Sequence, residues 1–147
     1  MWVIPCNTKY YDIIGVFDNL DVIEWSQSTN TSAGDTVFIY VGGTYKAIMY
    51  KCEVVSTDLY GKRSDEDYPY YKELEKNPDA RYMKLRLVEK YATDRYPLKN
   101  LKENGLSNVQ GRSKAPVQLM KYLNDNWPER WHLKCHLKNF LNNFLQT

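Results

Sequence analysis

Apolar and polar residues follow one another along this chain in a pattern that predicts a β-rich domain with a few helices. Alternating or continuous apolar stretches typical of strands occupy residues 2–5, 22–25, 36–43, 45–57 and 81–91. Helical spacing or helix-start signals occur over residues 11–20, in one or two turns at 97–102 and in a helix that begins at Pro116. The mixture predicts an α+β fold.

The segment from residue 58 to 79 interrupts the pattern, because it is charged and rich in tyrosine. A short helix is expected at about 70–76, ended by Asn77-Pro78. Two interpretations stay open. The segment is either a solvated excursion between strands, or a flap that brings Arg63 and the tyrosines of 68–71 to a nucleic-acid groove.

The tail over residues 126–147 is expected to form a further amphipathic helix. Its apolar residues fall on one stripe at steps of three and four: Leu133, Leu137, Phe140, Leu141 and Phe144. Such a stripe can pack on the preceding domain, dock a partner or form a homodimer. We therefore expect a domain at 1–125 and a C-terminal helix at 126–147.

Composition limits the classes of protein that fit. A length of 147 residues is that of one domain, and a net charge of +2 does not by itself indicate a nucleic-acid-binding face. Three widely spaced cysteines are typical of free thiols in a reducing cytoplasm. No charged-then-apolar leader or membrane-length apolar run is present, so the sequence predicts a cytoplasmic protein with no membrane partner.

Signatures of catalysis are missing from the sequence. It has neither a phosphate-binding P-loop nor a Gly-x-Ser-x-Gly elbow. His132 and His136 have the spacing of a helical metal pair, but the Glu of a His-Glu-x-x-His motif is missing and Lys134 lies between them. We expect no enzyme activity, no cofactor and no metal.

The opening stretch carries the most suggestive polar and aromatic groups. A polar corner, Asn7-Thr8-Lys9, follows the first strand, and Trp25 ends the second. If both lie at one edge of a sheet, a flat aromatic face would adjoin amide and hydroxyl groups, an arrangement that suits a nucleobase. The alternative is that Trp25 belongs to the hydrophobic core.

Four pieces of the chain, in order, resemble the EVE domain of the PUA-like superfamily, which also includes the YTH domains that read methylated adenine in RNA. They are residues 2–12, 23–27, 34–42 continuing into 47–52, and 109–112. The chain is most similar to EVE domains found N-terminal to HNH modification-dependent restriction endonucleases. The resemblance implies a small PUA-like β-barrel of five to six strands flanked by helices, with a pocket for a flipped, modified base.

The resemblance also implies roles for individual residues. Trp25 matches the aromatic residue that stacks on the base, Asn7 matches a polar contact to the base edge, and residues 110–112 match the loop that approaches the backbone. The expected base pocket consists of Asn7, Trp25, Ser26, Gln27, Ser28 and Tyr40. The expected contacts to the nucleic-acid backbone are Lys9, Gln110, Gly111, Arg112 and Lys114.

The resulting hypothesis is a reader of modified bases. Modified cytosine in DNA is the expected ligand, in preference to RNA, and a nuclease domain or subunit is the expected partner. The alternatives are an RNA-binding PUA-like module and a protein-interaction module without base recognition. A panel of modified DNA and RNA oligonucleotides separates the DNA reader from the RNA-binding module. A partner that binds without nucleic acid would favour the protein-interaction module.

Overall fold

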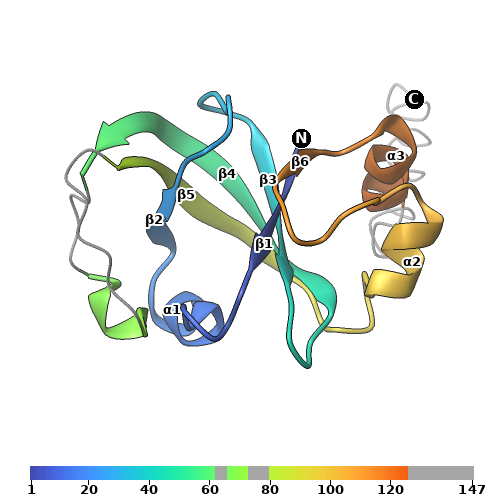
Figure 1. The fold of residues 1–147 in the computed structure, drawn as a ribbon, viewed down its shortest axis with the longest axis horizontal. Coiled ribbons are helices and arrows are strands. Elements are labelled where there is room, and N and C mark those ends of the chain that lie inside the picture. Colours follow the sequence, from blue (N-terminus) through green and yellow to red (C-terminus); the bar gives the residue numbers. More distant parts are fainter. Residues whose placement is uncertain (62–65, 73–79, 126–147) are drawn as a thin grey trace, which may run out of the picture.

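Six strands form one sheet in the computed structural model, which describes residues 1–61, 66–72 and 80–125 (Figure 1). The strands are β1 (Trp2–Cys6), β2 (Val22–Ser26), β3 (Thr36–Val41), β4 (Ala47–Tyr60), β5 (Arg81–Lys90) and β6 (Ser113–Lys114). Their order across the sheet is β2-β5-β4-β3-β1-β6. The helices are α1 (Ile13–Asn19), α2 (Leu98–Glu103) and α3 (Val117–Asp125), with a 3₁₀ turn, η1, at Tyr68–Tyr70.

The pairing of β1 with β3 is parallel, whereas every other strand pair in the described sheet is antiparallel. Helix α1 and strand β2 lie between these two strands in the sequence. Strand β3 is central, and residues 37–41 are all buried, which explains its continuous apolar run. Because the strands are parallel, the ends of β1 and β3 lie beside each other, with Cys6 opposite Val41.

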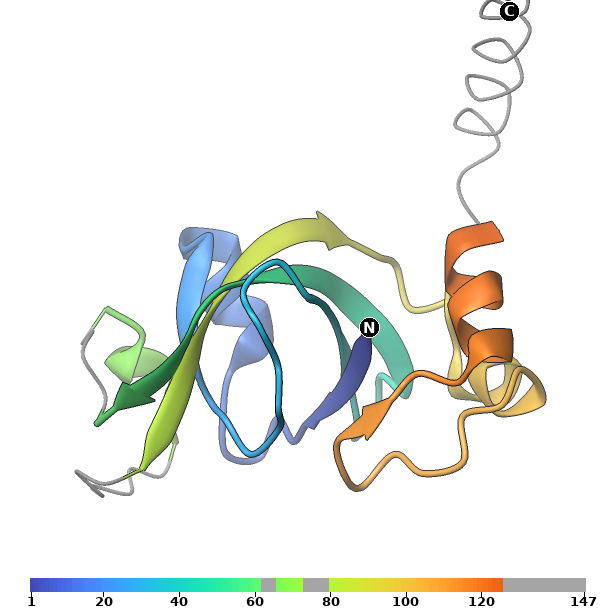
Figure 2. The same cartoon turned by 90° about the horizontal axis from the view of Figure 1, so that it is seen from above.

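Alternate side chains of the strands supply two separate hydrophobic cores, one on each face of the sheet. Ile4 and Cys6 belong to the core beneath α1, whereas Val3 belongs to the core beneath α2 and α3. The sheet is strongly curled, with α1 on one side and α2 and α3 on the other (Figures 1 and 2).

The fold confirms the α+β prediction and corrects its details. Within the described residues the sheet is not closed into a barrel, because β2 and β6 form its two edges. Ser113 and Lys114, predicted to lie in a loop, form a short strand because they pair with Val3 and Trp2. Strand β4 runs to Tyr60 rather than ending at Thr57, with bulges that accommodate the extra residues.

Some expectations concern residues that the structure does not describe. The predicted tail helix at 126–147, its stripe and both histidines lie outside the described residues, as do Arg63 and most of the helix expected at 70–76. In the described part, Cys6 and Cys52 are buried free thiols, as predicted. No helix in residues 1–61, 66–72 and 80–125 is long and apolar enough to cross a membrane.

Candidate nucleic-acid interface

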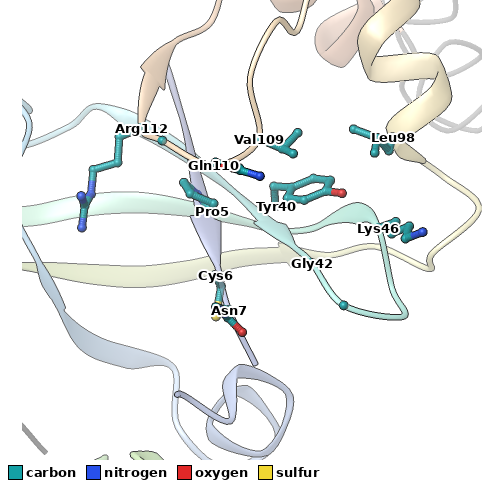
Figure 3. Close-up of a pocket in the computed structure, with 12 residues that line it drawn as sticks. Pro5, Cys6, Asn7, Tyr40, Gly42, Lys46, Leu98, Val109, Gln110 and Arg112 are labelled. Atoms are coloured by element: carbon teal, nitrogen blue, oxygen red, sulfur yellow. The ribbon is translucent and has the colours of Figure 1, made fainter. Parts of the chain in front are cut away.

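A pocket of about 830 Å³ opens on the α2–α3 side of the sheet, where β1 and β3 end (Figure 3). It is built from three stretches and the start of α2. The lining residues are Pro5, Cys6, Asn7, Tyr40, Gly42, Gly43, Lys46, Leu98, Val109, Gln110, Gly111 and Arg112. Ligand-binding pockets typically measure about 300–1,000 Å³, so a nucleotide fits this volume.

The parallel pairing of β1 and β3 builds the floor of the pocket. Pro5 lies opposite Tyr40, so that both side chains project from the same face. The backbone N–H of Gly42 donates to the carbonyl of Cys6 over 3.2 Å and continues the pairing into the turn. Tyr40 is only 4% exposed, and burial raises the pKa of its hydroxyl, which therefore stays neutral at physiological pH.

Asn7 leaves the end of β1 at the rim of the pocket, with an exposed side chain. Its Oδ1 accepts the backbone N–H of Lys9 at 2.9 Å, and its backbone carbonyl accepts the N–H of Tyr10 at 3.0 Å. These bonds fix the corner and orient the carboxamide. The Nδ2 group, on the other arm of that carboxamide, is a donor that can reach a ligand.

Lys46 supplies a cation from the turn between β3 and β4. It has a left-handed backbone with φ of 49°, which is uncommon for a residue with a side chain. Its carbonyl accepts the N–H of Leu98 at 2.9 Å, and a β-bridge joins the next residue, Ala47, to Pro97. The start of α2 therefore fixes the backbone that carries this ammonium group.

The loop at 109–112 forms the opposite wall. Its chain reverses in a turn in which the N–H of Gln110 donates to Oδ1 of Asn108 at 2.8 Å. Directly after Arg112, β6 pairs with β1, so that Ser113 lies opposite Val3. The first strand of the fold thus positions this loop, although the two are distant in sequence.

Five residues singled out from the sequence come together in this pocket. Asn7 and Tyr40 were expected at the base, and Gln110, Gly111 and Arg112 at the nucleic-acid backbone. The charged residues among the described lining are Lys46 and Arg112, both cations, with no Asp or Glu among them. The electrostatics of the pocket therefore favour an anionic ligand.

The structure places the other expected base-pocket residues elsewhere. Strand β2 is the edge strand on the far side of β5, β4 and β3 from β1. Trp25 is half-buried there and packs against the core beneath α1. Ser26 and Ser28 are exposed at the end of β2, and none of the three lines the pocket described above.

Gln27 is 6% exposed and takes part in a network of hydrogen bonds that shapes the end of β4. Its Oε1 accepts the N–H of Asp58 at 2.8 Å, and its Nε2 donates to the carbonyl of Thr29 at 3.2 Å. Asp58 has a positive φ of 57° and forms an ion pair with Arg81 at 3.2 Å. The carboxamide of Gln27 is therefore occupied by backbone groups.

Two residues that were expected to contact the nucleic-acid backbone also lie outside the pocket lining. The ammonium group of Lys9 lies 5.6 Å from the centre of the Tyr10 ring, and that of Lys114 lies 5.5 Å from the centre of the Trp2 ring. Both lysines are exposed. These cation–π contacts place the two charges beside rings rather than beside the pocket residues.

Sequence reasoning missed Lys46 and the apolar walls at Leu98 and Val109. The Gly42-Gly43 pair indicated the hairpin, and a cation just after such a turn was the available signal for Lys46. The parallel pairing of β1 with β3 was not predicted, and it is this pairing that brings the turn beside Asn7.

A second, smaller cavity of about 250 Å³ has the opposite electrostatic character. It is lined by Val22, Ile23, Glu24, Glu66, Asp67 and Lys84. Glu24 and Asp67 are each 2% exposed, and the hydroxyl of Tyr11 donates to Oδ2 of Asp67 at 3.2 Å. Burial and the neighbouring Asp67 raise the pKa of Tyr11, so its hydroxyl remains a donor. Three acids make this cavity unsuited to a phosphate.

Comparisons with solved structures identify the fold. ASCH from Zymomonas mobilis superimposes with a TM-score of 0.54 at 12% identity, covering 84% of this chain and 93% of that chain. Two mutant forms of the same protein give TM-scores of 0.54 and 0.55 at 14% and 11% identity, covering 84% of this chain and 96% and 94% of theirs. The chain has a PUA-like fold.

Within the PUA-like fold class, these neighbours are ASCH domains, whereas the sequence resembles EVE domains. No family model matches the chain, and no curated protein matches its sequence. The comparisons thus show the PUA-like fold alone, and the relation to EVE domains stays a prediction from the sequence resemblance.

Proposed function

We propose that this protein is a nucleic-acid-binding module that holds one unstacked base in the pocket of Figure 3. One observation supports it above all. Residues from three separate parts of the chain, selected from the sequence for nucleic-acid contact, line a single cavity of about 830 Å³ whose described charges are both positive. The PUA-like fold is consistent with this role.

The chemistry of the walls suits a nucleobase flanked by its sugar and phosphates. Leu98 and Val109 offer apolar contact, and the Tyr40 ring lies at the centre of the lining (Figure 3). The carboxamides of Asn7 and Gln110 can donate to and accept from a base edge. Extruding a base costs a few kcal/mol, which the apolar contacts and the hydrogen bonds of these walls must return.

The finer proposal is that the base is modified, with modified cytosine in DNA as the leading candidate. It rests on the resemblance to EVE domains that precede HNH nucleases. In that setting, the protein would deliver a nuclease domain or subunit to modified DNA. Recognition of the added group would come from the apolar wall, because a methyl group buried there gains about 0.8 kcal/mol.

We propose binding without catalysis. Cys6 is the cysteine among the described lining residues, but its side chain belongs to the core beneath α1, and burial raises the pKa of its thiol to about 12. The thiolate is therefore scarcely populated at neutral pH, which disfavours attack on a ligand. Within the described residues, no three His, Cys, Asp or Glu side chains come together as a metal site.

Fluorescence anisotropy at one fixed salt concentration tests the proposal. The probes are duplex DNAs carrying cytosine, methylcytosine, hydroxymethylcytosine or methyladenine at one position, with matched RNAs. We expect tighter binding to one modified DNA, weakened by Asn7→Ala and Gln110→Ala. A preference for RNA would support the alternative RNA-binding module. No binding to any probe would reject the proposed function and favour a protein-interaction module.

Lys121→Ala serves as a matched control, because Lys121 is exposed on α3 and does not line the pocket. It removes one surface charge without touching the proposed contacts. If it weakens binding as much as Asn7→Ala does, the pocket is not the binding site.

A further inference from the structure

We infer that the pocket binds an internal nucleotide of a strand, with one flanking phosphate at Lys46 and the other at Arg112; this inference rests on the function proposed above. An internal nucleotide carries a phosphate on each side of its sugar, on O5′ and on O3′. A nucleoside carries none, and a terminal nucleotide can carry one. A site with two separated cations can distinguish these cases.

The position of Lys46 supports this inference first. Its left-handed backbone, with φ of 49°, is held by the bond from the N–H of Leu98 to its carbonyl at 2.9 Å. A left-handed conformation costs a residue with a side chain about 1–2 kcal/mol. Residues held in such sparsely populated conformations cluster at active sites and ligand-binding positions. Here the side chain of Lys46 is the cation of one pocket wall.

The position of Arg112 supports it independently. The loop that carries Arg112 is fixed at one end by the turn at Asn108 and at the other by the pairing of Ser113 with Val3. Because Arg112 directly precedes the paired residue, its backbone cannot shift far without breaking β6. The guanidinium group can form two parallel hydrogen bonds to a phosphate.

The two cations lie on opposite sides of the ring that occupies the middle of the pocket. In Figure 3, Tyr40 lies between Lys46 and Arg112, which come from different walls, and their charged ends point away from the ring in opposite directions. A single phosphate would be met best by two cations that converge on it. Two cations on opposite sides of the pocket instead match a base in the middle of the pocket with a phosphate on either side.

The nearby cations are less suited to this task. Lys9 and Lys114 each lie against an aromatic ring outside the pocket lining. The small acid-lined cavity would repel a phosphate. Among the described residues, the arrangement of two cations about one cavity is thus specific to Lys46 and Arg112.

Competition with nucleotides of defined phosphorylation tests the inference. The full chain is bound to a labelled single-stranded decamer that carries the base preferred in the anisotropy panel, and the label is displaced by each of the four deoxynucleosides and by their 5′-monophosphates, 3′-monophosphates and 3′,5′-bisphosphates. For the base that competes best, we expect the bisphosphate to be about tenfold stronger than either monophosphate, because each phosphate adds a charge-assisted contact.

Two single variants make the test specific. Lys46→Asn removes the charge and keeps a side chain that tolerates the left-handed backbone, and Arg112→Gln removes the other charge from an exposed position. Each variant should lose the increase in affinity that one of the two phosphates provides, and keep the increase that the other provides. The two should therefore show opposite preferences between the 5′- and 3′-monophosphates. Lys121→Gln, away from the pocket, should compete like the wild-type protein.

The outcomes separate this inference from the proposed function. If the decamer binds and Asn7→Ala weakens it, but the bisphosphate is no better than a monophosphate, the inference fails and the proposed function survives. The inference alone also fails if both cation variants lose the gain from the same phosphate. If the decamer does not bind, or if its binding ignores both Asn7→Ala and Gln110→Ala, both proposals fail.

Discussion

The ring of Trp25 meets the ring of Tyr11 edge-on, with their centres 5.4 Å apart and their planes at 87°. This contact joins the end of β2 to the start of α1, because Tyr11 follows the corner at Asn7 and precedes that helix. Edge-to-face pairs of this kind contribute about 0.5–1.5 kcal/mol beyond the area they bury. The pair connects the edge strand to the core beneath α1.

Trp25→Ala should therefore reduce the free energy of unfolding by about 2 kcal/mol, less than for a fully buried tryptophan because Trp25 is half-buried. Urea unfolding measures this change. If Trp25 instead stacks on the modified base, as the EVE resemblance implies, the variant should lose base preference. Trp25→Phe is the control, since it keeps an aromatic ring and should retain most of the stability. If Trp25→Ala remains stable but no longer discriminates the modified base, the base binds at the end of β2 and not in the pocket.

Arg112→Ala should weaken binding to all nucleic acids by a similar factor. A phosphate contact contributes affinity without sequence information, and each one lost should reduce the slope of log K against log salt by about one. Anisotropy titrations at several salt concentrations measure this slope. The comparison is Lys121→Ala, which is expected to leave the slope unchanged. A loss confined to one base sequence would show instead that Arg112 reads a base edge.

Gln27→Ala should destabilise the fold without changing nucleic-acid affinity. The substitution deprives the Asp58 N–H of its acceptor, which costs about 1–3 kcal/mol, whereas the Thr29 carbonyl keeps the guanidinium group of Arg81 as a donor at 3.2 Å. Thermal unfolding and anisotropy, performed on the same samples, measure the two effects separately. Ser28→Ala is the control, because Ser28 is exposed and its substitution should change stability little. If Gln27→Ala binds weakly while its melting temperature is unchanged, the glutamine contacts the ligand.

The two buried thiols should make stability fall at alkaline pH. Burial raises the pKa of Cys6 and of Cys52 from the ordinary 9.0 to about 12, so the folded state keeps both protons longer than the unfolded state does. Their contribution to stability is complete below pH 9.0 and is lost as the pH rises toward about 12. In that range each thiol should reduce the free energy of unfolding by about 1.4 kcal/mol per pH unit.

Urea unfolding from about pH 8 to pH 10 checks this slope. Cys52→Ala lowers stability at every pH by leaving a small cavity, yet it should make the decline above pH 9.0 shallower. Iodoacetamide should also modify Cys6 and Cys52 much more slowly in the native protein than in urea, since both are buried. Rapid labelling of native Cys6 would show that the core beneath α1 opens in the folded protein.

Most elements of the fold follow from local pattern, whereas the site depends on pairings that local pattern does not encode. The alternation in β5 and the turn glycines after β3 were sufficient to place those elements. The sequence also predicted that Asn7 and Trp25 lie together. In the structure, Tyr11 rather than Asn7 meets Trp25, and Asn7 lines a pocket beside the other core.

The reason is geometric. Successive residues after a strand can turn toward either face of a sheet, and tertiary pairing decides which. The parallel pairing of β1 with β3 brings the turn that carries Lys46 to the corner at Asn7, and the two-residue strand β6 positions Arg112. A two-residue strand has almost no periodic pattern in the sequence. Residues 107–114 were therefore predicted to be a loop, although they include β6, the strand that completes the pocket.

The pairing of β6 with β1 has a consequence for the order in which the protein is made. Trp2 can pair with Lys114 only after Lys114 has been synthesised. The pocket wall at residues 109–112 is therefore missing until nearly all of the described chain has left the ribosome. Loop closure over such a distance is slow compared with the formation of hairpins such as β3–β4. Nascent chains should therefore fold their central hairpin early and acquire a complete pocket last.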